Sequence, residues 1–214
     1  MKKKKNGFTF VELLAMLVIL GLIMVIAIPN ITGMLNNQKI NQFKSDANSM
    51  AEAAKVKVGK DRVLVRPKNG ECIVFSLNYL DDTDSIKSGP NGGNYDQFDS
   101  FVVYTRNGTK YEYYVRLVEE YNNKRTGLDL LKSTEIRNLK GTGIKDITNN
   151  SGLLKDDTRD QGINKLKSFS KLSSICSSIK GYYSGGNYCI EYNGIYYDNE
   201  GNRISPSKFE EVCG

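Results

Sequence analysis

One carboxylate, that of Glu12, lies near the start of a long apolar run, where a charged side chain is unusual. The run covers residues 8–28 (FTFVELLAMLVILGLIMVIAI), and only Thr9, Glu12 and Gly21 in it are not clearly apolar. Inserting a carboxylate into lipid raises the free energy by at least ~2.5 kcal/mol. An ionisable residue in such a segment therefore indicates a functional role by default. The chemistry open to Glu12 is electrostatic: it can pair with a cation in a medium of low dielectric constant.

Four cysteines supply the other reactive groups of the chain: Cys72, Cys176, Cys189 and Cys213. Their number is even and none are spaced as CxxC, so in an exported protein they favour two disulfides over a zinc site. Four cysteines allow three pairings, and the sequence alone does not choose among them.

Histidine, the side chain most often used as a general base, is missing. The chain therefore cannot build a Ser-His-Asp or Cys-His catalytic set, and it lacks the commonest metal ligand. The acidic stretch DDTDSIKSGPNGG lacks the glycine and terminal glutamate of an EF-hand loop, and no glycine-rich phosphate loop is present. We therefore expect a protein that is not an enzyme and binds neither a metal nor a cofactor.

The positive charge of the chain is concentrated at its start. The formal net charge is +6, and the segment MKKKKNG contributes four lysines and no acid, so the remaining residues carry +6 minus 4, or +2. The body is therefore close to neutral, which gives little support to nucleic acid as a partner.

The element that must position Glu12 is a helix over residues 8–28. Such a helix is about 32 Å long, which matches the hydrocarbon core of a bilayer, and Lys2 to Lys5 before it predict a cytoplasmic N-terminus with the rest of the chain outside. A plain transmembrane anchor fits these features. A secretory signal cleaved after Ala27 also fits, although the run exceeds the usual length of a signal core and carries a charge.

The stretch GFTFVE resembles the processing site of type IV pilins and of the pseudopilins of type II secretion and competence DNA-uptake systems. The resemblance implies that a prepilin peptidase cuts after Gly7 on the cytoplasmic side and N-methylates the new first residue, Phe8. Glu12 matches the acidic position of that family.

Further positions extend the resemblance over about the first 30 residues. Gly21 and Pro29 fall where the family has a glycine and a helix-kinking proline, so this region is expected to bend or melt, and Phe10 departs from the more usual leucine. The short basic leader suits the type IVa group.

The resemblance also implies a role for Glu12. Cleavage before Phe8 creates a new positive amino group, and in a helical filament the N-terminal helices bundle in a dry core. We expect the Phe8 amine of one subunit to pair with Glu12 of a neighbour. The implied partners are other copies of the chain or related pilins, the prepilin peptidase, the pilus assembly platform and the inner or cytoplasmic membrane.

Beyond Pro29 the helix becomes amphipathic. Apolar residues recur at three- and four-residue intervals at Phe43, Ala47, Met50, Ala51, Ala54 and Val58. With Gly59 as a stop, one helix is expected from Phe8 to about Val58, roughly 75 Å long. The domain organisation is then a basic leader (1–7), a transmembrane or filament-core helix (8–28), its amphipathic continuation (29–58) and an extracellular head (59–214).

The head is expected to be an α+β domain with an antiparallel sheet packed on the spine helix, as in pilins. Strands are predicted at 63–65, at 71–77 and in two hairpins turning at Asn107-Gly108 and Asn193-Gly194. Helices are predicted within 126–138 and 162–181, with an exposed loop over 140–162. Lysines 165, 167, 171 and 180 lie mostly off the apolar stripe of the second helix, which favours a solvated face over a ligand site.

The C-terminal region between Cys189 and Cys213 resembles the disulfide-bounded loop of many pilins. That resemblance favours a Cys189–Cys213 bond, with Cys176–Cys213 nearly as reasonable.

Together these features predict a structural subunit of a type IV pilus, held in the cell membrane before assembly and part of an extracellular filament afterwards, with adhesion, motility or biofilm formation as outputs. A pseudopilin is the near alternative because it shares the N-terminal residues. A membrane-anchored extracellular binding domain and a secreted hydrolase are the alternatives from other classes, and the lack of histidine weighs against the hydrolase.

Overall fold

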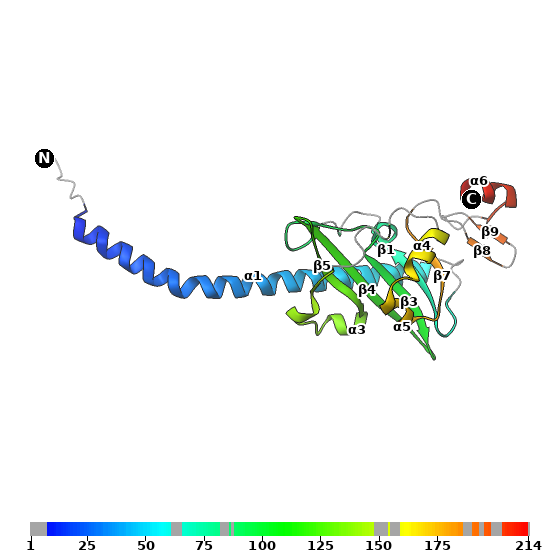
Figure 1. Ribbon diagram of the computed structural model, residues 1–214, viewed down its shortest axis with the longest axis horizontal. Helices are drawn as coiled ribbons and strands as arrows, with labels where there is room; N and C mark the ends of the chain where they lie inside the picture. Colours follow the sequence, from blue (N-terminus) through cyan, green and yellow to red (C-terminus); the bar gives the residue numbers. More distant parts are fainter. Residues whose placement is uncertain are drawn as a thin grey trace. The chain divides into compact units, whose positions relative to one another are not determined.

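The computed structural model describes residues 8–60, 66–81, 86, 88–147, 154, 159–185, 190–192, 195–197 and 203–213. The chain forms two compact units, Met1–Lys39 and Ile40–Gly214, which are described separately (Figure 1). Helix α1 (Phe10–Lys60) begins in the first unit and ends in the second.

In the first unit, α1 continues without a break through Gly21 and Pro29. The expectation was that this region bends or melts, and the melting is therefore not seen. A proline removes one backbone hydrogen bond, and the helical bonds on both sides maintain the helix. The large apolar side chains described in this unit are exposed: Phe8, Phe10, Val11, Leu13, Leu14, Met16, Leu17, Val18, Ile19, Leu20, Leu22, Ile23, Met24, Met34 and Leu35.

Residues 8–28 were expected to cross a membrane. Within the described part of the chain, no helix combines the length and the apolar character that a membrane span requires.

In the second unit, the last part of α1 packs against a sheet through one face. The residues of that face are at most 1% exposed and follow the predicted three- and four-residue spacing: Phe43, Ala47, Met50, Ala51 and Ala54. The predicted stripe is confirmed. The helix ends at Lys60, so Gly59 lies in its last turn rather than beyond it.

The main sheet has the strand order β6-β5-β4-β3-β1-β7, and a short strand, β2, pairs with one end of β4. All described pairs except one are antiparallel, which confirms the mixed helix-and-sheet class. The exception is β7, which runs parallel to β1, so the expected antiparallel sheet is antiparallel in most of its pairs and not in all of them. The strands are β1 (Glu71–Ser76), β2 (Asn94–Tyr95), β3 (Phe101–Asn107), β4 (Lys110–Tyr121), β5 (Lys124–Lys132), β6 (Lys145–Asp146) and β7 (Ser178–Tyr183).

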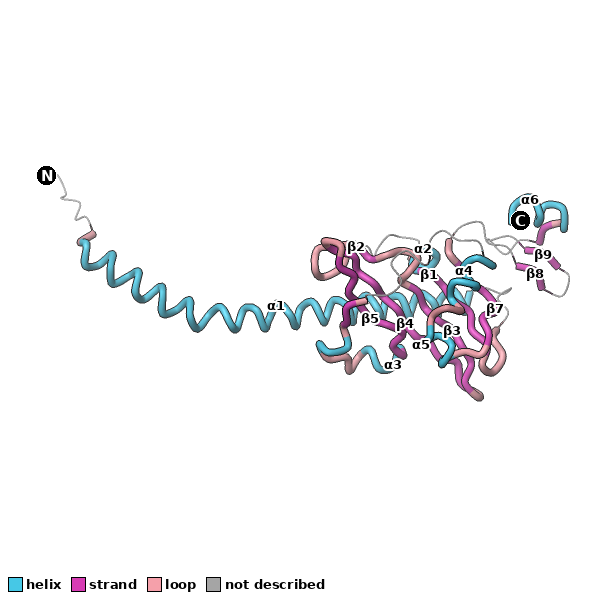
Figure 2. Tube along the Cα trace, viewed as in Figure 1, coloured by secondary structure: helices cyan, strands magenta, loops and turns pink. Residues whose placement is uncertain are grey.

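Helices lie against both faces of the main sheet (Figure 2), and residues at its centre are buried on both faces. In β1, Ile73 and Phe75 belong to the core shared with α1, whereas Cys72 and Val74 belong to a second core on the opposite face. Two short helices, α4 (Arg159–Leu166) and α5 (Ser170–Ile175), contribute Leu166 and Leu172 to that second core. Burial on both faces explains why β1 reads as a continuous apolar run, CIVF, instead of alternating.

The predicted hairpin between β3 and β4 is confirmed, but its turn is shifted by one residue. Asn107 pairs with Lys110, so the two loop residues are Gly108 and Thr109. Of the two, only Gly108 has a positive φ, at 61°, which is the pattern of a type II′ turn with glycine first.

The two helices predicted in the middle of the head are wrong in part. Residues 124–132 form strand β5, paired with β4 and β6, and only α3 (Ser133–Ile136) is helical in the first stretch. Pairing with neighbouring strands overrides local helix preference here. The second stretch divides into the end of α4, all of α5 and the start of β7, although its apolar stripe is buried as expected at Leu166, Phe169 and Leu172.

A small second sheet and a helix end the chain. Strands β8 (Ile190–Tyr192) and β9 (Ile195–Tyr197) pair antiparallel with Tyr192 opposite Ile195, which confirms the predicted pairing of these two strands. The predicted turn at Asn193-Gly194 lies outside the described residues. The remaining elements are β10 (Arg203–Ile204), α6 (Pro206–Cys213), α2 (Leu77–Leu80) and η1 (Gly141–Gly143). The strand predicted at 63–65 lies outside the described residues.

Candidate processing and assembly site

The first turn of α1 is closed by a reciprocal pair of side chains, Thr9 and Glu12. Oε2 of Glu12 accepts a hydrogen bond from the backbone N–H of Thr9 at 2.8 Å and from the Thr9 hydroxyl at 2.9 Å. In return, the Thr9 Oγ1 accepts a hydrogen bond from the backbone N–H of Glu12 at 3.3 Å. This arrangement is a capping box, which satisfies backbone donors that the first turn of a helix otherwise leaves unpaired.

The capping box fixes where the charge of Glu12 lies. Its carboxylate bonds to the peptide N–H that joins Phe8 to Thr9, so it lies one peptide unit from the residue expected to become the new N-terminus. The positive end of the helix dipole is also at this end of α1, where it stabilises an anion. Phe8 is 73% exposed, so its main chain stands at an accessible end of the helix.

The sequence interpretation of Glu12 missed this local role. The spacing Thr-x-x-Glu immediately before an apolar helix is itself the sequence signature of a capping box, and TFVE at residues 9–12 carries it. Glu12 therefore has a structural role within its own chain, and its expected pairing with Phe8 of a neighbouring copy stays a prediction.

The remaining expected site residues of the N-terminal segment are placed as follows. Gly7 lies outside the described residues. A Cβ added at Gly21 would meet no atom within 4 Å, so no contact within the described chain requires a glycine there. Pro29 lies within α1, and its side chain is outside the described set.

The structure assigns one disulfide, between Cys72 and Cys176, with 5.7 Å between the Cα atoms. The Cys176–Cys213 pairing is therefore wrong. Residues that precede the parallel strands β1 and β7 lie side by side, because the N–H of Ser177 bonds to the carbonyl of Gly70 at 2.8 Å. Cys189 and the side chain of Cys213 lie outside the described residues, so their pairing stays a prediction.

A buried charge cluster in the head was also missed. Nη2 of Arg125 donates to Oδ2 of Asp99 at 2.7 Å and to Oδ2 of Asp96 at 2.9 Å, and Arg116 bonds to Asp129. Burial raises the pKa of Asp99, while the guanidinium groups of Arg116 and Arg125 act against that rise. Asp99, Arg116 and Arg125 are buried, and their contacts join β4, β5 and the loop before β3.

Among the residues that the structure describes, no three His, Cys, Asp or Glu side chains are grouped so that they could hold a metal ion. The described polar groups of the N-terminal site are instead the Glu12 carboxylate, the Thr9 hydroxyl and the peptide N–H of Thr9.

The comparison with known proteins concerns the same segment. Residues 2–28 match the family model described as the prokaryotic N-terminal methylation motif. No curated protein and no solved structure matches the chain. The chain therefore carries, at residues 2–28, the hallmark of type IV pilins and prepilin-like proteins.

Proposed function

We propose that this chain is a structural subunit of a type IV pilus, which polymerises through α1 after the leader has been removed. A prepilin peptidase cuts between Gly7 and Phe8 and methylates the new amino group of Phe8. The observation that carries the proposal is the position of Glu12, whose carboxylate lies one peptide unit from Phe8 at the start of an exposed apolar helix.

The proposed assembly contact pairs opposite charges. Each processed subunit brings one ammonium, on Phe8, and one carboxylate, on Glu12, into a core of apolar helices. Burial of either charge alone is costly, whereas a close pair of opposite charges offsets part of that cost. The axial register that places the Phe8 amine beside a neighbour's Glu12 is therefore favoured over other registers.

Before assembly, the chain is proposed to reside in the cell membrane with the lysine-rich leader in the cytoplasm and the head outside. The exposed apolar side chains of residues 8–24 need an apolar environment, and lipid first and neighbouring helices later supply it. The assembly platform then extracts the subunit into an extracellular filament, where residues around Pro29 can unwind under load.

The first test is the N-terminus and intact mass of this chain in material sheared from the surface of the producing cells. The proposal expects a chain that begins at methylated Phe8. A chain that begins at Met1 would instead favour a simple membrane anchor with a binding head, and cleavage after Ala27 would favour a secretory signal. Correct processing without any chain in the sheared fraction would favour a pseudopilin of a secretion or DNA-uptake system.

Two variants separate the charge of Glu12 from its capping role. Glu12→Gln keeps a side chain that can complete a capping box but removes the charge, whereas Thr9→Ala removes the hydroxyl cap and keeps the charge. We expect both variants to be processed, and filaments to be lost in Glu12→Gln but retained in Thr9→Ala. The opposite result would mean that Glu12 acts through the helix cap and not through pairing with Phe8.

A further inference from the structure

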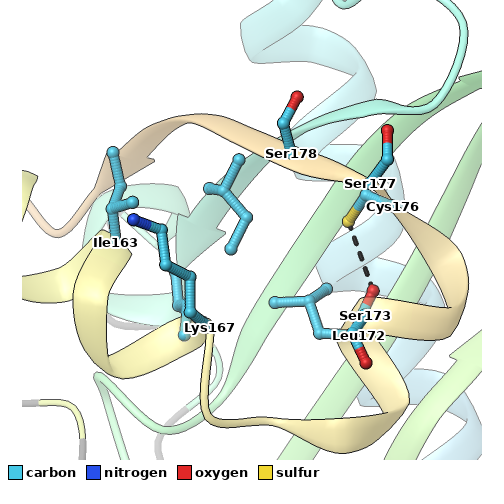
Figure 3. Close-up of a pocket in the computed structure, with 9 residues that line it drawn as sticks. Ile163, Lys167, Leu172, Ser173, Cys176, Ser177 and Ser178 are labelled. Carbon is cyan, nitrogen blue, oxygen red and sulfur yellow. Dashed lines mark hydrogen bonds between the residues drawn. The ribbon is translucent and has the colours of Figure 1, made fainter.

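A cavity of about 340 Å³ lies in the head between α4, α5 and β7, at the surface of the core that includes Cys176. Figure 3 shows Lys167 on the α4 side of this cavity, with Cys176 and Ser173 across from it. The cavity is at the small end of the range for ligand sites, which suits a compact molecule rather than a large one.

The inner wall of the cavity is apolar. Leu166 and Leu172 have at most 1% of their surface exposed, and the half-buried side chains of Ile163 and Ile179 complete the wall. A ligand that fills this space must therefore present an alkyl or similarly apolar body.

The polar groups at the rim differ in what they can still bind. The hydroxyl of Ser173 donates to the carbonyl of Ser170 at 2.7 Å, and that of Ser177 donates to the carbonyl of Gly70 at 2.9 Å. Their hydrogens are thus already engaged. Ser178 also lines the cavity, and Lys167 is the lining residue that carries a full charge.

The charge of Lys167 is not neutralised by any ion pair that the structure assigns within the described residues. Its Nζ donates to the neutral amide oxygen of Asn164 at 3.2 Å, whereas Lys171 pairs with Asp129 and Lys180 pairs with Glu71. The described lining of the cavity also contains no Asp or Glu. The rim therefore attracts an anion and not a cation.

We propose that this cavity binds small carboxylates with an alkyl body of about four to six carbons. The carboxylate bonds to Lys167 at the rim, and the alkyl body lies against Leu166, Leu172 and Ile179. The site is separate from the N-terminal segment and does not depend on the pilin function.

The test is a titration of the full chain in lipid nanodiscs with hexanoate, followed by NMR of ¹³C-labelled isoleucine and leucine methyl groups. Acetate supplies the charge without the apolar body, and hexanol supplies the body without the charge. Empty nanodiscs correct for partition of both six-carbon probes into lipid. We expect hexanoate to give saturable shifts at the methyl groups of Ile163 and Ile179, and the other two probes to bind at least about tenfold more weakly.

Matched variants test the role of the cation. Lys167→Met should weaken hexanoate binding about tenfold, and Lys167→Arg should restore it because the charge is kept. Lys110→Met, at the exposed start of β4, makes the same change in net charge away from the cavity and should have no effect. Because Lys167 is exposed, an unchanged methyl spectrum of the free variant confirms its fold.

Three results would each overturn the proposal. The first is the absence of saturable shifts at Ile163 and Ile179. The second is equal binding of hexanol and hexanoate, which would mean an apolar hollow without anion recognition. The third is unchanged affinity in Lys167→Met.

Discussion

Removal of the Cys72–Cys176 bond is expected to cost the head a large part of its stability. The two residues are separated by 104 positions, so the bond closes a long loop in the unfolded chain. In the chain-entropy model, a loop of about 100 residues corresponds to about 4.7 kcal/mol at 25 °C. That loss is comparable with the whole free energy of unfolding of many domains, and Cys72→Ala/Cys176→Ala should therefore be close to unfolding.

The assay is urea unfolding of the full chain in detergent, read by tyrosine fluorescence and near-ultraviolet circular dichroism. The chain has no tryptophan, and all 13 tyrosines lie from Tyr79 onward, so both signals report on the head and not on the N-terminal helix. The variant should unfold at a lower urea midpoint. Its slope with urea should rise, because an unfolded chain without the cross-link exposes more surface.

The control keeps only this bond. In Cys189→Ala/Cys213→Ala, the oxidised and reduced forms differ by the Cys72–Cys176 bond alone, so their stabilities should differ by a similar amount without any change of buried side chain. A difference below about 1 kcal/mol would refute the loop argument. Peptide mapping that joined Cys72 to Cys189 or Cys213 would refute the pairing itself.

Three further predictions concern the packing of the head, and urea midpoints measure all of them. Gly127→Ala should destabilise the head by about 2–3 kcal/mol, because its Cβ would overlap the carbonyl oxygen of Leu117; a midpoint equal to wild type would contradict the strand pairing. The hydrogen bond from Lys132 lowers the pKa of Glu112, so the stability that Glu112 adds at neutral pH is lost as the pH falls through that lowered pKa. The urea midpoint of Glu112→Gln should therefore lie further below that of wild type at pH 7 than at pH 3. The same difference in midpoint at both pH values would contradict this prediction. Tyr95→Phe should lower the free energy of unfolding by about 1 kcal/mol, because the Tyr95 hydroxyl donates to the carboxylate of Asp46 on α1 at 2.7 Å. An unchanged urea midpoint would mean that this hydrogen bond does not stabilise the packing of the sheet on α1.

Local patterns in the sequence predict the N-terminal helix, with an apolar first part and an amphipathic second part. The stripe from Phe43 to Ala54 predicts a buried face because residues three and four apart lie on the same side of a helix, and that face is buried in the structure. The Thr-x-x-Glu spacing at Thr9 and Glu12 was equally readable, because a capping box depends only on neighbours in one turn. The turn at Gly108 is local for the same reason.

The tertiary structure alone decided the features that join distant parts of the chain. Residues 124–132 became a strand because β4 and β6 supply hydrogen-bond partners on both sides, a benefit that no local pattern reveals. The partner of Cys72 depends on β7 entering the sheet parallel to β1, after about a hundred intervening residues. Asp99 lies in the loop before β3, whereas Arg116 lies on β4 and Arg125 on the neighbouring β5. Only the folded sheet brings Arg125 within hydrogen-bond distance of the Asp99 carboxylate, at 2.7 Å, and Arg116 within ion-pair distance of it, at 3.5 Å. The spacing of apolar residues and the capping of a helix depend on residues within one or two helical turns. The neighbours of a strand, the partner of a cysteine and the members of a buried ion pair depend instead on the packing of the whole head.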